Sequence, residues 1–486
     1  MSSPRGVGGA GRVGRVGRVR FVLNGKAVTA DGPAHLTVLQ WLRAQGLCGT
    51  KEGCAEGECG ACAVAVLASE PGEAGSHFEP VNSCLLPLGA VEGRELITVE
   101  GIAEAGDLHP VQAAMVAAGG SQCGYCTPGF VVSLFCEYYR PGREHFDPES
   151  ISGNLCRCTG YRPIADVARA LPAPAAADGR LVQLRTRSAP LENSESGTPA
   201  ARFFRPTQLA DALALLAAHP TAQAIAGGTD LIVYANQRYQ RFPELVSLEA
   251  LSELHELTFS DSELVLGAAL PLSRIERALH GQKAGASLLE QLLPLFSSRL
   301  IRNRATLGGN LGTASPIGDS APALLALGAE LELVSSRGTR RLPLSEFFLG
   351  YRRTALGAGE LIRAVRIPRP LPSFQRFYKV SKRVLDDIST VAAGFALTLD
   401  AEGRVTRFGV GLGGVAATPL AAASLERIAL GSSWNETTLA LLLTEASRLG
   451  TPQSDLRGSA EYRRALLGKL LERFYYESRQ QSEAAE

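Results

Sequence analysis

Eight of the ten cysteines form two groups whose spacing suits a metal centre. In the first group the chain reads Cys54-x4-Cys59-x2-Cys62, and Cys84 follows as a distant fourth thiol. This x4/x2 spacing is the plant-type ferredoxin pattern for a [2Fe–2S] cluster. Glycines between these cysteines let the backbone curl around a cluster and direct N–H groups at its sulfurs. Four thiolates also suit a structural zinc ion, but the spacing and the glycine density favour iron and sulfur.

The second group combines a C-x-x-C motif, Cys123 and Cys126, with a C-x-C motif, Cys156 and Cys158. The C-x-x-C half is common to zinc, iron–sulfur and redox dithiol sites, so it discriminates little. Each pair precedes a predicted helix, and a helix N-terminus favours the thiolate form of cysteine. This placement suits a second anionic cluster, although spacing alone leaves zinc as an open alternative.

Disulfides are another use for paired cysteines, and the expected compartment argues against them. The N-terminus has no apolar stretch of the kind that precedes a signal-peptide cleavage site, so we expect a cytoplasmic protein. Disulfides rarely persist in that reducing environment. Cys48 and Cys136 fit neither spacing, and we expect both to be small buried side chains.

Composition excludes several classes of function. The 49 basic and 48 acidic residues nearly balance, with a formal net charge of +1, which argues against a nucleic-acid partner. The sequence has no run of about 18 apolar residues of the kind that crosses a membrane. It also offers no evident Ser-His-Asp or paired-carboxylate arrangement, so no catalytic side chain is predicted. The 486 residues give room for three or four domains, at roughly 100–200 residues each.

A small α+β unit is predicted to hold the first cysteine group, at residues 19–103. Its start alternates in hydrophobicity around Asn24-Gly25, which is a β-hairpin signal. A segment of helical periodicity and two more short apolar runs follow. The predicted elements are strands at 19–23, 26–28, 63–67 and 96–99 and a helix at 37–47.

The rest of the chain divides by its periodicity. Helical patterns surround the second cysteine group and predict a compact bundle. Residues 174–200 are rich in Ala, Pro, Ser and Glu without sustained periodicity, so we interpret them as an interdomain linker. Alternating helices and strands then predict an α/β region and a separate α+β unit. The predicted boundaries are a disordered Gly-Arg-Val tail at 1–18 and domains at 19–103, 104–173, 201–371 and 372–480.

Longer motifs around both cysteine groups resemble the iron–sulfur domains of the molybdenum hydroxylase family. They are GTKEGC ending at Cys54, GAC ending at Cys62, QCGYCTPG around Cys126 and GNLCRCTGY around Cys158. That family carries two [2Fe–2S] clusters, so the resemblance implies a cluster at each group. The ligand pattern of the family falls on Cys54, Cys59, Cys62 and Cys84 for one cluster and on Cys123, Cys126, Cys156 and Cys158 for the other.

Two loops further along, AIAGGTDL at 224–231 and TLGGN at 306–310, are similar to the FAD-binding domain of the same family. The physical interpretation agrees, because a Gly-Gly turn after a strand exposes N–H groups that can cradle a pyrophosphate. One such loop is more commonly a plain turn, so the pair is the stronger signal. The resemblance implies flavin contacts for Ala224, Ile225, Ala226, Gly227, Gly228, Thr229, Asp230, Leu231, Thr306, Gly309, Asn310 and Asp319.

Three more residues match flavin contacts by the same resemblance. They are Phe296, Ile362 and Lys379. Each also has a simple structural interpretation, with Phe296 and Ile362 in the core and Lys379 on the solvated surface. The residue types leave both interpretations open.

The order of two clusters followed by a flavin is most similar to the small subunit of bacterial xanthine dehydrogenases. The resemblance implies a multidomain α+β fold: a β-grasp ferredoxin-like domain, a helical-bundle [2Fe–2S] domain, an α/β FAD-binding domain and an α+β C-terminal flavoprotein domain. Electrons from hypoxanthine or xanthine would enter at molybdenum in a separate molybdopterin-binding large subunit. They would pass the Cys123 cluster, the Cys54 cluster and FAD before reaching NAD as co-substrate.

We expect the two kinds of subunit to form a heterotetramer with two copies of each. The same architecture would also serve an aldehyde, carbon monoxide or aromatic acyl-thioester oxidoreductase, which differ in the partner's substrate. A function of another class, a non-catalytic electron carrier, is the remaining alternative.

Overall fold

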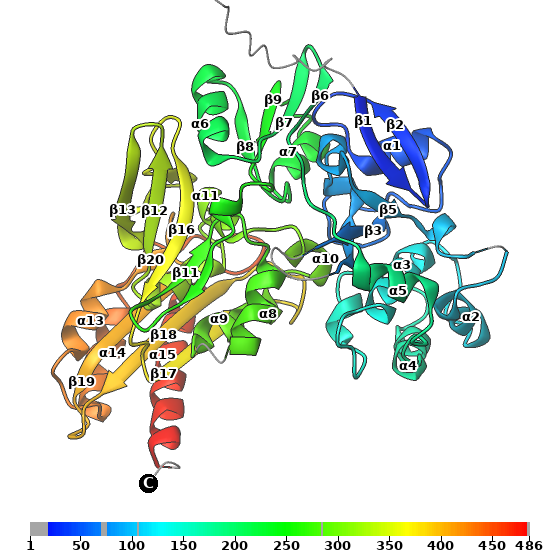
Figure 1. Ribbon diagram of the computed structural model, residues 1–486. Helices are drawn as coiled ribbons and strands as arrows, with labels where there is room; N and C mark the ends of the chain where they lie inside the picture. Colours follow the sequence, from blue (N-terminus) through cyan, green and yellow to red (C-terminus); the bar gives the residue numbers. More distant parts are fainter. Residues whose placement is uncertain (1–17, 70–74, 105, 283–284, 484–486) are drawn as a thin grey trace, which may run out of the picture.

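The structure is a computed structural model that describes residues 18–69, 75–104, 106–282 and 285–483. Four units follow one another along the chain: a mixed sheet, a group of helices, an α/β region and a second α+β unit (Figure 1). The predicted multidomain α+β fold is confirmed. The predicted tail lies outside the described residues except for Arg18, which begins the first strand.

A hairpin opens the first unit, as the sequence predicts. Strands β1 and β2 pair around Asn24 and Gly25, which adopt φ values of 51° and 76°. β1 also pairs in parallel with β5, so the sheet order is β2-β1-β5-β3-β4. Only β4 has no counterpart among the predicted strands. The elements are β1 (Arg18–Leu23), β2 (Lys26–Asp31), α1 (Val38–Ala44), β3 (Ala63–Ala68), β4 (His77–Asn82) and β5 (Glu95–Ile97).

Strand β3 is buried on both faces and separates two cores. Val64 and Val66 belong to the core that contains α1 and β1. Ala63, Ala65 and Leu67 alternate to the other face and pack with the helices of the second unit. Since successive side chains of a strand point to opposite faces, this short apolar run joins the sheet to the helices.

Helix α3 is the centre of the second unit. Every residue from Gly129 to Tyr138 is buried, because β3, β4 and α2 all pack against this helix. The helices lie together on the right-hand side of Figure 1. Their bounds are α2 (Pro110–Ala117), α3 (Thr127–Tyr138), α4 (Arg162–Ala170) and α5 (Gly179–Thr186).

The segment 174–200 is more ordered than the predicted linker. It contains α5 and the strand β6 (Ser194–Thr198). β6 pairs antiparallel with β7 of the next unit, and the backbone N–H of Ser76 donates to the carbonyl of Leu184 at 2.6 Å. The predicted linker therefore contains regular structure, because these elements gain stability from tertiary partners rather than from their own hydrophobic periodicity.

Two sheets form the α/β region. In the first, of order β6-β7-β9-β8, strands β7, β9 and β8 run parallel. The second has the order β10-β11-β16-β12-β13, with antiparallel pairs throughout. Leucines of β11 and β12 pack with those of α8, α9 and α12 in its core. The elements after β6 are β7 (Ala201–Arg205), α6 (Leu209–Ala218), β8 (Gln223–Ile225), α7 (Leu231–Gln237), β9 (Glu244–Ser247), β10 (Leu257–Phe259), β11 (Glu263–Gly267), α8 (Leu272–Gln282), α9 (Ser287–Leu292), α10 (Arg299–Arg302), α11 (Leu307–Gly312), α12 (Ser320–Ala326), β12 (Glu330–Ser335), β13 (Gly338–Pro343), β14 (Phe348–Gly350), β15 (Arg353–Thr354) and β16 (Leu361–Pro368).

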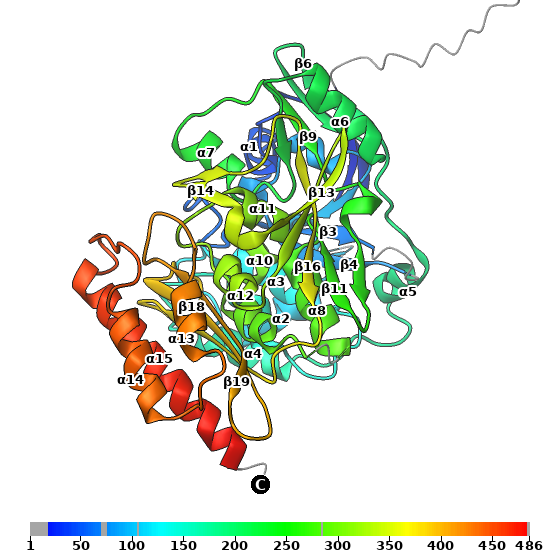
Figure 2. The same ribbon diagram turned by 90° about the vertical axis from the view of Figure 1, so that its left-hand side faces the viewer.

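The last unit is an antiparallel sheet of order β17-β18-β19-β20 covered by helices. Phe395 and Phe474 stack in its core with ring centroids 5.0 Å apart. Figure 2 shows α14 and α15 along the outer edge of the molecule. No helix among the described residues is both long and apolar enough to cross a bilayer. The elements are β17 (Phe374–Val380), β18 (Val391–Leu399), β19 (Val405–Gly413), β20 (Leu420–Ala421), α13 (Ala423–Ala429), α14 (Glu436–Ala446) and α15 (Ala460–Glu483).

A buried arginine joins the helical unit to the α/β region. The Arg302 side chain in α10 is fully buried, and its guanidinium contacts Glu149 at 2.6 Å and Glu276 at 3.3 Å. Glu149 belongs to the helical unit and Glu276 to α8. A buried charge is tolerated only when it is paired, so these contacts fix the relative position of the two units.

We predict that Arg302→Met destabilises the protein by about 3–5 kcal/mol, because two largely buried carboxylates would lose their counter-charge. The measurement is the midpoint of thermal unfolding. Arg169→Met is the matched control, since Arg169 pairs with Asp166 at the surface, with both side chains at least 60% exposed, and such pairs contribute little. Equal midpoints for the two variants would contradict the prediction.

Candidate functional site

The first cysteine group gathers around a tight loop that follows α1. Cys62 and Cys84 are buried, whereas Cys54 and Cys59 are partly exposed. Asn82 holds the group together from β4, because its side-chain amide donates to the Gly57 carbonyl at 2.8 Å while its oxygen lies 3.6 Å from the Cys62 sulfur. The structure therefore brings all four predicted thiols of this group to one place.

The second group is assembled from two helix starts, as predicted. Cys126 is the residue just before α3, and Cys156 and Cys158 lie on the loop that leads into α4. The sulfurs of Cys123 and Cys158 are 3.5 Å apart. Both of these residues are exposed, so this group lies at the molecular surface and the first group lies deeper.

The thiols meet in pairs within each group. Contacts between sulfurs join Cys54 to Cys59 and Cys62 to Cys84. Among the described residues, no three Cys, His, Asp or Glu side chains converge closely enough for a single metal ion. A [2Fe–2S] cluster uses four thiolates shared between two irons, whereas zinc needs all four ligands around one ion. The paired arrangement therefore fits a two-iron cluster better than zinc.

Hydrogen bonding within the pairs favours thiolates. The side-chain hydrogen bond from Cys59 lowers the pKa of the Cys54 thiol to about 5. The corresponding bond from Cys84 lowers the pKa of Cys62, although burial opposes it. Each partner that donates has its own pKa raised. Thiolate is the form that binds metal, so one sulfur of each pair is already biased toward ligation.

Close backbone packing connects the two groups. The N–H of Leu155, next to Cys156, donates to the Cys59 carbonyl at 3.0 Å, and the Asn154 amide donates to the Gly60 carbonyl at 3.2 Å. A Cβ added at Gly129 would lie 2.2 Å from that Gly60 carbonyl oxygen. Only glycine fits here, and the absence of a side chain lets the two loops touch.

The two glycine loops predicted to bind flavin lie against each other. A Cβ at Gly227 would be 1.7 Å from the Arg304 carbonyl oxygen, just before the second loop. The Thr313 hydroxyl, directly after α11, donates to the Asp230 carboxylate at 3.1 Å. Thr306 caps α11 by accepting from the Gly309 N–H at 3.1 Å. A Cβ at Gly312 would meet nothing within 4 Å, so one side of α11 is open to a ligand, which fits a flavin.

Lys379 and Asp319 form a buried ion pair between the last two units. The Lys379 ammonium lies 2.9 Å from the Asp319 carboxylate and donates to the Leu295 carbonyl at 2.8 Å. Its side chain is only 2% exposed, so the interpretation of Lys379 as solvated surface is wrong. Ser389 donates to the same carboxylate at 2.5 Å. This network lies beside Phe296, the residue after Leu295.

The remaining predicted flavin residues differ in their surroundings. Phe296 is partly buried against the core of the α/β region, and its carbonyl accepts from Arg302 at 3.1 Å. Ile362 is buried in the same core on β16, which is the simple structural role. β16 also packs against α11, so Ile362 lies on the strand next to the second glycine loop. Asn310 accepts a hydrogen bond from Ser320, the residue after Asp319.

Helix α7 connects the first flavin loop to the first cysteine group. The Asn236 amide donates to the carbonyls of Ala55 and Cys84, at 2.9 Å in each case. The Gln237 amide donates to the Cys54 carbonyl, also at 2.9 Å. Sequence reasoning missed these two residues. Amide side chains at the end of a short helix have no spacing signal that would reveal partners more than 150 positions away.

Of the two cysteines outside both groups, one is buried as predicted and the other is not. Cys136 is buried in α3, as predicted, but Cys48 is exposed. Cys48 lies just after α1, and its carbonyl accepts from Lys51 at 2.8 Å. The prediction for Cys48 fails because apolar character alone does not bury a residue in a surface turn.

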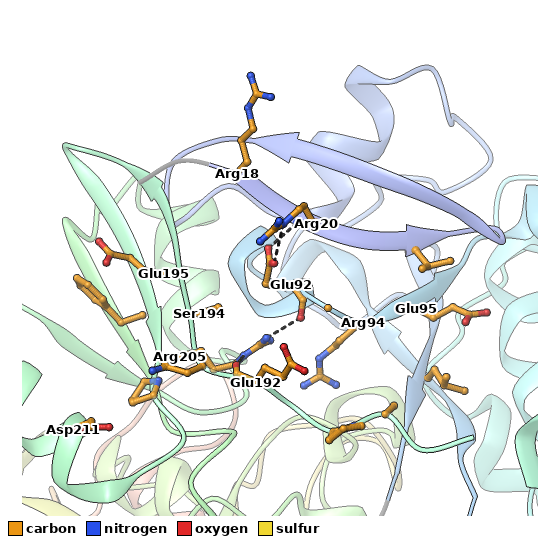
Figure 3. A pocket seen from close by; sticks show the side chains of 18 of the residues that line it. Arg18, Arg20, Glu92, Arg94, Glu95, Glu192, Ser194, Glu195, Arg205 and Asp211 are labelled. Atoms are coloured by element: carbon orange, nitrogen blue, oxygen red, sulfur yellow. Dashed lines mark hydrogen bonds and ion pairs between the residues drawn. The ribbon is translucent and has the colours of Figure 1, made fainter. Parts of the chain in front are cut away.

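A large cavity lies away from these sites. It has a volume of about 1580 Å³ and lies between β1 and the segment around β6 (Figure 3). Arg20 pairs with Glu92 there at 3.6 Å, and Arg205 donates to the Glu92 carbonyl at 2.8 Å. None of its lining residues is a predicted cluster or flavin residue. This cavity is therefore not part of the predicted cofactor sites, which are recognised by their thiol pairs and loops.

Four domain families match in the same order as these sites. They are described as "2Fe-2S iron-sulfur cluster binding domain" over residues 21–88, "[2Fe-2S] binding domain" over 98–169, "FAD binding domain in molybdopterin dehydrogenase" over 198–370 and "CO dehydrogenase flavoprotein C-terminal domain" over 376–478. The chain belongs to the molybdenum hydroxylase family. It is therefore an oxidoreductase chain of that family, with two [2Fe–2S] domains and an FAD-binding domain.

Related molybdenum hydroxylases include fused xanthine dehydrogenases. The chain is 33% identical to the xanthine dehydrogenase of Emericella nidulans, over 96% of this chain and 39% of that protein. It is 32% identical to xanthine dehydrogenase 2 of Arabidopsis thaliana, over 94% of this chain and 39% of that protein. The chain thus spans about two fifths of the length of these relatives.

Solved structures of the family resemble part of the chain. The reconstituted CO dehydrogenase from Oligotropha carboxidovorans has a chain with 31% identity and a TM-score of 0.51, covering 55% of this chain and 94% of that one. Quinoline 2-oxidoreductase from Pseudomonas putida 86 has a chain with 28% identity and a TM-score of 0.52, covering 57% and 96% respectively.

We predict that Gly129→Ala prevents assembly at both cysteine groups, because its Cβ would collide with the Gly60 carbonyl and force the two loops apart. The measurement is iron and acid-labile sulfide per chain, together with visible absorption. Gly179→Ala is the matched control, since it also has negative φ and its Cβ would meet nothing within 4 Å. Full iron content in Gly129→Ala would show that the contact is dispensable.

Proposed function

We propose that this chain is the iron–sulfur and flavin part of an NAD-dependent xanthine dehydrogenase, working with a molybdopterin-binding large subunit. In this proposal the chain receives electrons from the oxidation of hypoxanthine or xanthine and delivers them to NAD. It contributes binding, spacing and electrostatics, since the redox chemistry belongs to cofactors. The proposal predicts an assembly of two copies of each subunit.

The observation that carries the proposal is the row formed by the three sites. The surface thiols of the second group connect to the first group through the Leu155–Cys59 hydrogen bond of 3.0 Å. The first group connects to the flavin loops through Gln237, which donates to the Cys54 carbonyl at 2.9 Å. Such a row supports an order of transfer from the surface, through the first cysteine group, to the flavin.

Each site would hold its cofactor through the residues predicted for it. Cys54, Cys59, Cys62 and Cys84 would bind one [2Fe–2S] cluster, and Cys123, Cys126, Cys156 and Cys158 the other. When bound, the clusters supply one-electron transfer and FAD supplies hydride transfer to NAD. Asn82 and Asn154 hold the loops of the first group in place by their amide hydrogen bonds to Gly57 and Gly60.

The flavin loops would bind the pyrophosphate of FAD through backbone groups. Gly227 and Gly228 bring the first loop onto the second without side chains in the way. The Asp230–Thr313 hydrogen bond closes the two loops. Lys379 places a positive charge at the junction with the C-terminal unit, where it is held by Asp319. A fixed cation beside the flavin would stabilise negative charge on the reduced ring.

The surface around the second cysteine group is the proposed docking site of the molybdopterin subunit. Cys123 and Cys158 are exposed there. Tyr125, Leu155 and Tyr161 next to them are also exposed, by 50%, 38% and 41%. Large apolar side chains gathered on a surface indicate a protein interface. A partner seated here would bring its own centre next to the outermost thiols.

A second candidate function has the same electron path with a different partner. The structural neighbours are a carbon monoxide dehydrogenase and a quinoline oxidoreductase, whereas the long relatives are xanthine dehydrogenases. The higher coverage of this chain by the xanthine dehydrogenases favours purine oxidation. The deciding measurement is the activity of the co-purified complex with xanthine, quinoline or carbon monoxide as substrate. A complex that oxidises quinoline or carbon monoxide but not xanthine would overturn the first candidate.

We predict that Cys156→Ala abolishes NAD reduction by xanthine in the complex, because electrons would no longer enter the chain. Oxidation of NADH with an artificial acceptor should persist, since it needs only the flavin end of the row. Both rates are measured by absorbance at the nicotinamide band. Cys48→Ala, at an exposed cysteine outside both groups, should alter neither rate. Loss of both activities in Cys156→Ala would reduce the site to a structural role.

We predict that Lys379→Met lowers flavin content several-fold, because Asp319 would remain as a buried, unpaired carboxylate at the junction. The measurement is FAD released on denaturation, per chain, with iron content as an internal reference. Lys382→Met is the control, since Lys382 is exposed and its ammonium donates to the Leu456 carbonyl at 2.8 Å. An unchanged flavin content in Lys379→Met would show that Lys379 is not needed for flavin binding.

A further inference from the structure

The hydroxyl of Thr159 contacts a sulfur of the second cysteine group, and we propose that Thr159 sets the redox potential of the [2Fe–2S] cluster at this group. Thr159 follows Cys158 in the loop that leads into α4. Its Oγ1 lies 3.2 Å from the Cys156 sulfur, and its backbone N–H donates to the same sulfur at 3.4 Å. A cluster at this group is part of the proposed function, on which this assignment rests.

The direction of the hydroxyl hydrogen bond follows from ligation. A free Cys156 thiol could donate its own proton to the Thr159 oxygen, but a sulfur that binds iron is a thiolate and has no proton. The Thr159 hydroxyl is then the donor in this contact. Together with the backbone N–H of the same residue, it directs two hydrogen bonds at one sulfur.

A closed set of hydrogen bonds holds the hydroxyl in this orientation. The backbone N–H of Tyr161 donates to the Thr159 Oγ1 at 3.2 Å, so the hydroxyl accepts on one side and keeps its single proton for the sulfur. The phenol oxygen of Tyr161 in turn accepts from the Cys156 N–H at 3.0 Å. Hydrogen bonds in such a chain polarise and strengthen one another.

The backbone of this turn is shaped for these contacts. Gly160 and Tyr161 both have a φ of 67°, a left-handed conformation that is unfavourable for a residue with a bulky side chain. Strained residues persist only where the surrounding structure holds them, and they gather at functional sites. Here the left-handed turn places the N–H and the phenol of Tyr161 against Thr159 and Cys156, so the Thr159 hydroxyl is fixed toward the sulfur.

Hydrogen bonds to ligand sulfurs favour the reduced state of an iron–sulfur cluster. Reduction adds one negative charge, part of which the sulfurs carry, and donors directed at the sulfurs stabilise that charge. Thr159 would therefore raise the potential of the second cluster above the value that it would have without the hydroxyl. Cys123 and Cys158 of the same group are exposed, so Thr159 would act where electrons enter the chain and would favour their entry.

A purely structural role of the hydroxyl leads to a different result. Threonine hydroxyls often accept from the backbone N–H two residues further on, which stabilises a turn. If Thr159 served only the turn before α4, loss of its hydroxyl would lower the cluster content or the stability of the loop. The potential of the clusters that remain would then be unchanged, so a measured potential separates the two roles.

The test is a redox titration of the full chain loaded with iron and flavin, with both clusters followed by electron paramagnetic resonance. Cys156→Ala identifies the signal of the second cluster by its loss. We expect Thr159→Val, which has a similar shape without the hydroxyl, to lower the ratio of reduced to oxidised second cluster about tenfold at a fixed potential. This change equals a shift of about 59 mV for one electron. Thr159→Ser keeps the hydroxyl and should restore the original potential, and the first cluster should not shift.

Thr127→Val is the matched control. Thr127 directly follows Cys126 of the same group, but its hydroxyl donates to the Ser121 hydroxyl at 2.8 Å, so the potential should stay unchanged. An unchanged potential in Thr159→Val, or an equal shift in Thr127→Val, would overturn the inference. Loss of the second cluster's iron in Thr159→Val would also overturn it, because the hydroxyl would then be structural. An unaltered chain that assembles only one cluster would overturn the proposed function as well.

Discussion

The contact between Gly60, Gly129 and Gly153 is the constraint on which both cysteine groups depend. A Cβ at Gly60 would lie 2.2 Å from the Gly153 carbonyl oxygen, and one at Gly129 would lie equally close to the Gly60 oxygen. Backbone groups buried at such a junction must find partners, and the Leu155 N–H and the Asn154 amide supply them. Two loops from different units therefore become one rigid piece that presents all eight thiols.

Strand β3 fixes the first two units relative to each other, and buried ion pairs connect the last two units to them. Its two faces belong to different cores, so the ferredoxin-like sheet cannot rotate against α3 without exposing apolar surface, which is unfavourable. Arg302 then attaches the α/β region to the helical unit, and Lys379 attaches the C-terminal unit. Apolar packing thus sets the position of the first two units, and paired buried charges orient the last two.

Much of the site was predictable because its ligands follow local rules. Cysteine spacing and the helices that follow Cys126 and Cys158 predict the thiol groups, and the Gly-Gly turn at Gly227 predicts a backbone cradle. The first hairpin follows from Asn24-Gly25. What sequence could not show is contact over long separations. The bonds from Asn236 to Cys84 and from Lys379 to Asp319 join residues whose types are ordinary, and β4 and β6 exist because a neighbouring strand offers them hydrogen bonds.

Helix α7 has a consequence for how the protein acquires its cofactors. It begins at the end of the first flavin loop and finishes with two amides that hold the carbonyls of Ala55, Cys84 and Cys54. Ordering this helix at one end lowers the entropy cost of ordering it at the other. Under the proposed function, cluster binding and flavin binding would then be linked, and the linkage would be reciprocal. Chains made without iron would then also retain flavin poorly, although none of their proposed flavin residues is altered.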